Sequence, residues 1–401
     1  MPHETALIAT IAIGLAYAFV GGMVAVRLRL PPLVGYLLAG VVVGPFTPGF
    51  VGDAHIAPQL AEIGVILLMF GVGMHFSVSD LWAVRSIAVP GALAQIIVAT
   101  ALGVGVAHLW GWSLGAGLVF GLALSVASTV VLLRALEASG KVETADGRIA
   151  IGWLIVEDLV MVLALVLLPA FAPQLGGVTS SHDAAAGDGI WLSLAVTLGK
   201  VVLFVALMLV VGTRVFPWVL RRVERMKSRE LFTLGVVALA LGVAFGSAKL
   251  FGVSFALGAF FAGVVINECD FSHRAAADLQ PLQDAFGVLF FVAVGMLFDP
   301  MILLRRPLQV LAVLAIIVVG KSLAAFGIVL ALRRPCSTAL TVSAALAQIG
   351  EFSFILAGLG LSLGLITLEA QNLVLAGALL SITLNPLVFY LVSLAYPTKT
   401  T

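Results

Sequence analysis

The sequence predicts an all-α polytopic membrane protein with about thirteen transmembrane helices arranged as two inverted repeats. Three observations support this fold class. The chain is 62% hydrophobic and 10% charged, with a mean hydropathy of +1.19, which lies far outside the range of soluble proteins. Apolar runs of about 17 to 25 residues recur from end to end. The connections between these runs alternate between basic and nearly uncharged segments.

The apolar runs define the expected elements to within a few residues at each end. In chain order we expect helices over residues 5–26, 31–46, 58–74, 86–107, 113–135, 149–171, 190–213, 230–248, 253–267, 283–298, 308–332, 337–364 and 370–395. Together they form one transmembrane transport domain, 1–395, followed by a short tail, 396–401.

The distribution of basic residues predicts the orientation. Most of the 21 lysines and arginines fall in the connections after odd-numbered helices, whereas Lys249, Arg305 and Arg306 lie on the opposite side. Because basic loops stay in the cytoplasm, we expect the N-terminus outside and the C-terminal tail inside. The net charge of +1 predicts no nucleic-acid surface. The apolar composition predicts that a lipid bilayer surrounds the chain.

The seventh predicted helix, 190–213, separates two sets of six helices. An offset of seven spans reverses orientation, so helices one to six and eight to thirteen would be inverted repeats. Polar, small-residue interruptions fall at matching places in the two sets: Ser125, Ser128 and Thr129 in the fifth helix, and Gln348 and Glu351 in the twelfth. Such paired interruptions are typical of a midplane ion site. The alternative is that these hydroxyls only hydrogen-bond within their own helix.

An acidic pair, Glu157 and Asp158, lies near the middle of the predicted helix 149–171. A carboxylate at that depth costs about 2.5–3.5 kcal/mol on insertion scales, so two adjacent ones are rare without a partner and a function. Lys321, in the middle of the eleventh predicted helix, has the same expected depth, which predicts an internal ion pair. A carboxylate that holds either a proton or a cation makes the two ions compete for one site, which is the chemistry of an antiporter.

Two further acids lie inside predicted helices. Glu62 lines a funnel or makes a structural hydrogen bond, and its sequence context favours neither. Glu351 lies at an interruption, and we favour a supporting role at a half-helix N-terminus over direct ion binding. The sequence contains no pattern for a structural metal, a cofactor or an enzyme's nucleophile and base, so we expect a transporter and no enzyme.

Several segments together resemble the cation:proton antiporter-2 family, in its Kef-like branch. They are LPPLVGYLLAG at 30–40, GVILLMF at 64–70, LSVASTVV at 124–131, WLIVEDL at 153–159, FALGAFFAG at 255–263, FFVAVGM at 290–296 and AQIGEFSF at 347–354. Each is modest alone, but their order and spacing extend over nearly the whole chain.

The resemblance implies a sodium/proton antiporter fold with two crossed, broken helices, a mobile core domain and a homodimer in the bacterial inner membrane. The family's transport aspartate falls on Asp158, its partner position on Glu157 and its core lysine on Lys321. Related proteins often carry Asp, Asn or Gln where this chain has Glu157, so charge stoichiometry is not inherited. Many Kef-like proteins carry a regulatory nucleotide-binding domain after the membrane part. We expect none after residues 396–401, either because this regulation is absent or because the sequence is the membrane domain of a longer protein.

The predicted function is exchange of a monovalent cation, K⁺ rather than Na⁺, for protons by elevator-type alternating access. Asp158 would carry the proton or the cation (the monovalent metal ion), Lys321 would stabilise the charged aspartate, Glu157 would tune the pair or contribute a ligand, and Ser128 and Thr129 would complete the coordination. One alternative is a ligand-gated potassium efflux system without obligatory proton exchange. Another is an organic-anion symporter of the same inverted fold, for which this chain has too many buried acids.

Overall fold

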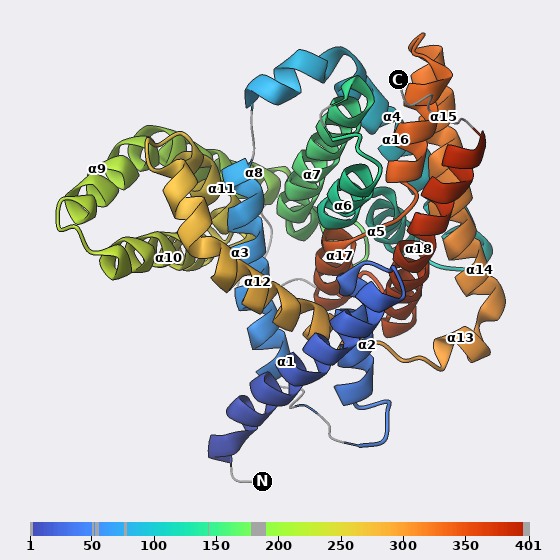
Figure 1. Ribbon diagram of the computed structural model, residues 1–401, viewed down its shortest axis with the longest axis horizontal. Coiled ribbons are helices and arrows are strands. Elements are labelled where there is room, and N and C mark those ends of the chain that lie inside the picture. The colour runs from blue at the N-terminus through green and yellow to red at the C-terminus, as the bar shows by residue number, and fades with distance from the viewer. Residues whose placement is uncertain are drawn as a thin grey trace.

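The computed structural model describes residues 3–395, apart from 50–51, 53–55, 76–77, 143 and 178–189. Within these ranges every regular element is a helix (Figure 1). The predicted tail, 396–401, lies outside the described residues. In the described part of the chain, ten helices are long and apolar enough to cross a membrane. The shorter apolar helices there are α2 (Pro32–Val43), α11 (Phe255–Asn267), α16 (Cys336–Ala345) and α17 (Glu351–Ser362). The all-α polytopic fold class is therefore confirmed, while the number of thirteen spans stays a prediction.

One set of helices packs around α3, and we call it the panel bundle. The helices α3, α11 and α12 form its centre, α1 and α2 pack on α12, and α10 packs on α11. Its members are α1 (His3–Arg27), α2 (Pro32–Val43), α3 (Ile56–His75), α10 (Arg229–Gly246) with the π-helix η2 (Ser247–Phe251), α11 (Phe255–Asn267) and α12 (Ser272–Met296).

A second set contains both predicted interruptions, and we call it the crossover bundle. Here α4 packs on α5 and α7, and α15 packs on α4 and α16. Its members are α4 (Val78–Leu109), α5 (Leu114–Ser125), α6 (Thr129–Ala138), α7 (Ala145–Phe171), α14 (Pro307–Ala315), η3 (Ile316–Gly320), α15 (Lys321–Ala331), α16 (Cys336–Ala345), α17 (Glu351–Ser362) and α18 (Leu368–Ala395); the short α13 (Ile302–Arg305) leads into α14.

The two bundles lie side by side, with α9, α10 and α11 at one end of the molecule and α14, α15 and α18 at the other (Figure 1). Each bundle takes consecutive helices from both halves of the chain, an arrangement that inverted repeats would produce. The repeat relation itself stays a prediction. The predicted connector is a longer element than expected: α8 (Ile190–Leu207), the π-helix η1 (Met208–Gly212) and α9 (Thr213–Glu224), which contacts α7, α10 and α11.

Glycines allow the helices of the panel bundle to approach closely. A Cβ atom at Gly73 would lie 2.1 Å from the carbonyl oxygen of Phe260, and one at Gly40 would lie 2.1 Å from that of Val292. The small surface that glycines give α1 is compatible with a dimer contact. In this structure, however, these glycines pack against other helices of the same chain. A Cβ at Gly21 would lie 2.5 Å from the carbonyl oxygen of Gly35. Small residues here serve packing within one subunit.

Three predicted helices have a wrong end: α4 begins at Val78, before the predicted 86, and in the other two the amphipathic turns give no hydropathy signal. The helix expected over 283–298 begins at Ser272, where an ion pair joins Arg274 to Glu224 and another joins Arg229 to Asp278 at 2.9 Å. The basic segment after 213 is likewise helical in α9 up to Glu224. Charged partners stabilise turns that the membrane length rule does not detect.

Candidate functional site

The site begins where two interrupted helices meet. The predicted helix 113–135 is divided into α5 and α6 by residues 126–128, and the predicted helix 337–364 is divided into α16 and α17 by residues 346–350. Both interruptions were predicted from their polar and small residues. They touch directly, because a Cβ atom at Gly350 would lie 2.3 Å from the Cβ of Ser128.

Reciprocal hydrogen bonds connect the two breaks. The backbone NH of Ser128 donates to Oε1 of Gln348 at 3.0 Å, and Nε2 of Gln348 donates to the carbonyl oxygen of Ser128 at 3.2 Å. The Ser128 hydroxyl donates to Oε2 of Glu351 at 2.9 Å and accepts from the NH of Val131, which makes Ser128 the N-cap of α6. Ser128, Gln348 and Glu351 are buried, and both backbone polar groups of Ser128 find their partner, Gln348, inside the protein.

The two neighbouring acids on α7, Glu157 and Asp158, form hydrogen bonds with different residues. Oε2 of Glu157 accepts a hydrogen bond from the NH of Ala127 at 2.8 Å, within the first break. Oδ2 of Asp158 accepts one from the Thr129 hydroxyl at 3.1 Å, at the first residue of α6. Among the described residues, Asp158 Oδ1 is buried without a hydrogen-bond partner, whereas the side chain of Trp153 interacts with the Glu157 carboxylate. The sequence neighbours therefore serve different parts of the site.

Lys321 is fully buried at the start of α15. Its Nζ donates to the carbonyl oxygen of Gln348 at 3.2 Å, within the second break. Its electrostatic partner is Glu157, and no ion pair in the described part of the chain joins it to a carboxylate by direct contact. Lys321 thus lies near the acidic pair, as its depth predicted, but on the side of Glu157.

Two amide side chains complete the support of the breaks. Nε2 of Gln95, on α4, donates to the carbonyl oxygen of Ser125 at 3.0 Å. Nδ2 of Asn385, on α18, donates to the carbonyl oxygen of Ala344 at 2.9 Å. Both residues are buried, and the sequence analysis missed both. The available signal was a lone amide in the middle of a long apolar helix, where a polar group needs a partner.

A cavity of about 400 Å³ lies between the two bundles at this point. The crossover bundle contributes Thr129, Asp158 and Glu351 to its wall, and the panel bundle contributes polar groups from α12. On α12, Gln283 is buried and donates to the carbonyl oxygen of Leu67 at 3.1 Å. The remaining polar members are the exposed Gln280 and Asp284, which are joined by a hydrogen bond. Neither Glu157 nor Lys321 lines this cavity.

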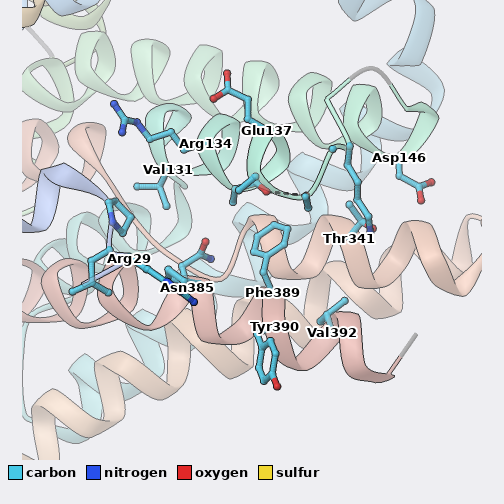
Figure 2. A pocket seen from close by; sticks show the side chains of 18 of the residues that line it. Arg29, Val131, Arg134, Glu137, Asp146, Thr341, Asn385, Phe389, Tyr390 and Val392 are labelled. Carbon is cyan, nitrogen blue, oxygen red and sulfur yellow. Dashed lines mark hydrogen bonds between the residues drawn. The ribbon is translucent and has the colours of Figure 1, made fainter. Parts of the chain in front are cut away.

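A larger cavity of about 980 Å³ lies at the other end of α6, next to α16 and α18 (Figure 2). It is lined by the charged residues Arg134, Glu137 and Asp146, while Asn385 and Phe389 form the opposite side. None of the predicted ion-binding residues lines it. The smaller cavity is therefore the candidate ion site. Of the residues that contact the breaks through side-chain amides, the larger cavity is lined by Asn385 alone.

Three predicted supporting residues, Gln348, Ser125 and Glu62, do not line the cavity, and neither does the predicted ion ligand Ser128. The Ser125 hydroxyl donates to the carbonyl oxygen of Leu122 in its own helix, so its backbone carbonyl, held by Gln95, is its contribution to the break. Glu62 is exposed near the start of α3 and does not line the cavity. The described residues contain no cluster of three or more His, Cys, Asp or Glu side chains that could hold a structural metal ion.

Comparison with known sequences identifies the family. The pattern described as "Sodium/hydrogen exchanger, transmembrane" matches residues 14–392. The chain belongs to this family. It is 62% identical over 391 residues to the Escherichia coli (strain K12) protein named "Putative cation/proton antiporter YbaL", covering 98% of this chain and 69% of that protein. It is 33% identical to K(+) efflux antiporter 4 of Arabidopsis thaliana, over 96% of this chain and 64% of that one.

A solved structure shows the same fold. The sodium proton antiporter MjNhaP1 from Methanocaldococcus jannaschii superposes with a TM-score of 0.71 at 17% identity, covering 97% of this chain and 98% of that chain. The resemblance to Kef-like cation:proton antiporters and the sodium/proton antiporter fold are therefore confirmed. The chain is a polytopic membrane protein. Its relatives are ion antiporters, which are transporters.

Proposed function

We propose that this protein exchanges a monovalent cation, K⁺ in preference to Na⁺, for protons across the bacterial inner membrane. The observation that carries the proposal is the position of Asp158. Its carboxylate lines the cavity between the two bundles, with one oxygen held by Thr129 and the other without a partner among the residues that the structure describes. A buried carboxylate in this position binds either a proton or a cation, and cannot keep both.

Competition for Asp158 becomes exchange if only the loaded site crosses the membrane. A bound proton or cation removes one negative charge from the site, so its transfer through a low-dielectric region is less costly. Without either ion, the charge holds the site at one face. Cation entry from one side then requires proton release, and the opposite step occurs on the other side.

The arrangement of the cavity supports an elevator-type movement. Asp158, Thr129 and Glu351 belong to the crossover bundle, whereas Gln280, Gln283 and Asp284 belong to the panel bundle. A displacement of one bundle against the other would carry the ion site past a fixed wall, as in transporters built from repeats. Glu157 and Lys321 would move together with the breaks that they contact.

The preference for K⁺ rests on the relatives, among which K⁺ efflux antiporters are prominent. A homodimer in the inner membrane, with the N-terminus outside and the C-terminus in the cytoplasm, is part of the same proposal. The basic connections support this orientation. Cys336 is exposed at the start of α16, so an impermeant maleimide should label it only from the cytoplasmic side. Labelling from outside would contradict the proposed orientation.

The decisive experiment is transport by the purified protein in liposomes. Gradients of K⁺, Na⁺, Rb⁺ and Li⁺ are imposed across the membrane, and internal pH is followed with a fluorescent dye. Asp158→Asn should reduce cation-driven proton flux to the level of protein-free liposomes. Asp270→Asn, an exposed carboxylate between α11 and α12, is the matched control and should transport normally.

Size-exclusion profiles must show that both variants remain folded. Full exchange by the Asp158→Asn protein would contradict the assignment of the carrier. Potassium flux without proton counter-movement in the wild type would instead favour a ligand-gated efflux pathway, the alternative function.

A further inference from the structure

Two carboxylates from different helices line the small cavity. They are Asp158 of α7 and Glu351 of α17, and Glu157, the sequence neighbour of Asp158, is not among the lining residues. Asp158 is 6% exposed and Glu351 is 3% exposed, and each repels the other electrostatically. The second acid of the ion cavity is therefore a residue that lies almost two hundred positions along the chain from the first.

Both carboxylates are held at the same end of α6. Consecutive hydroxyl groups orient them: Ser128 donates to Oε2 of Glu351 at 2.9 Å, and Thr129 donates to Oδ2 of Asp158 at 3.1 Å. The first residue of α6 is Thr129, and Glu351 is itself the first residue of α17. The N-termini of two half-helices thus point toward the pair, and their partial positive charge stabilises anions there.

The nearby lysine does not neutralise this pair. Lys321 donates to the carbonyl oxygen of Gln348 and is coupled to Glu157, outside the cavity. On the panel side the acid is Asp284, which is exposed and bonded to Gln280. Asp158 and Glu351 are therefore the buried acids of the described cavity wall, and no basic side chain lines that wall beside them.

We propose that Asp158 and Glu351 form a carboxylate dyad that binds one monovalent cation in exchange for one proton. Two adjacent buried carboxylates do not both stay ionised without a counter-ion, so the cation-free dyad retains one proton. A cation that enters binds to both carboxylates and displaces that proton to water. With either ion bound, the dyad carries the same single negative charge. Exchange through it is consequently electroneutral, one cation for one proton.

The dyad depends on the proposed exchange activity, and the experiment separates the two. Cation-driven proton flux by the wild type is measured first, and its absence would reject the exchange function together with the dyad that rests on it. Given flux, the wild-type rate should be insensitive to an imposed membrane potential. A rate that changes with the potential as expected for unequal charge movement would overturn the one-for-one dyad.

The role of Glu351 is tested by comparing variants of both hydrogen-bonded partners. Glu351→Gln keeps an acceptor for Ser128 but removes one charged ligand, so the KM for the cation should rise by about tenfold or more. Glu351→Asp keeps the charge and should remain closer to the wild type. Glu230→Gln, an exposed carboxylate in the first turn of α10, is the matched control and should leave the KM unchanged.

Ser128→Ala separates cation binding from structural support. It removes the hydroxyl that orients Glu351 but retains the carboxylate, so its KM should rise much less than that of Glu351→Gln. If Glu351 only accepts the Ser128 hydrogen bond, the Glu351→Gln protein keeps that bond, and its KM should be no higher than that of Ser128→Ala. That outcome, or an unchanged KM in a folded Glu351→Gln protein, would overturn the dyad.

Discussion

The two breaks of the crossover bundle have the same architecture and different charges. In each, a half-helix ends, a short non-helical segment follows and a second half-helix begins. A donor from a neighbouring long helix reaches a carbonyl oxygen of each break: Gln95 reaches Ser125, and Lys321 reaches Gln348. The first donor is a neutral amide, and the second is an ammonium group.

A second long helix also contributes to each break. Glu157 of α7 accepts from the NH of Ala127 in the first break, and Asn385 of α18 donates to Ala344 at the end of α16, before the second. The acid of one break and the base of the other are electrostatic partners. The difference indicates that Glu157 and Lys321 hold the two breaks together, which leaves Asp158 and Glu351 to face the cavity.

The largest expected effect follows from removing the charge of the second break. Lys321→Ala leaves Glu157 buried without its cation, so the free energy of unfolding should fall by about 3–5 kcal/mol. Lys321→Gln restores a donor of the kind found in the first break and should recover part of this loss. Thermal unfolding in detergent measures both, with the exposed Lys200→Ala as control. An unchanged unfolding temperature for Lys321→Ala would show that the charges do not join the breaks.

An intermediate effect is expected from separating the breaks sterically. Gly350→Ala places a methyl group 2.3 Å from Ser128 Cβ, and the strain should destabilise the protein by about 1–3 kcal/mol. Gly358→Ala, in the same half-helix, meets no atom within 4 Å and is the matched control. Transport and unfolding temperature should both fall only for the first variant. Equal behaviour of the two alanines would argue against direct contact between the breaks.

The smallest effect is expected at the neutral break. Gln95→Leu removes the donor to the Ser125 carbonyl, at a cost of about 1–2 kcal/mol. It also removes Gln95 Oε1, a buried atom without a partner among the described residues, which offsets part of the loss. Gln309→Leu, whose amide is not bonded to a break, should change the unfolding temperature less. A loss for Gln95→Leu as large as that for Lys321→Ala would remove the distinction between the breaks.

The two donors also bear on the predicted repeats. Gln95 lies in the fourth predicted helix and Lys321 in the eleventh, which the offset of seven spans makes equivalent. Asn385, in the thirteenth, corresponds in the same way to the acidic pair in the sixth. The helices that this offset pairs thus each contact one of the two breaks, while the inverted-repeat relation itself stays a prediction.

The sequence by itself determined the fold class, the positions of both breaks and the buried acids and lysine. These are local signals: an apolar run of membrane length, a cluster of small polar residues, or a charge inside such a run is visible without knowing any neighbour. Where the signal was amphipathic, as in the first turns of α12, the predicted boundary was wrong.

Only the tertiary structure decided which acids face the cavity. Adjacent residues on a helix point in directions about 100° apart, so packing alone placed Asp158 in the cavity and Glu157 on a break. The pairing of Ser128 with Glu351, the coupling of Lys321 to Glu157 and the roles of Gln95 and Asn385 join residues that are distant along the chain or on separate helices. Such contacts depend on how helices cross, and no local pattern encodes that geometry.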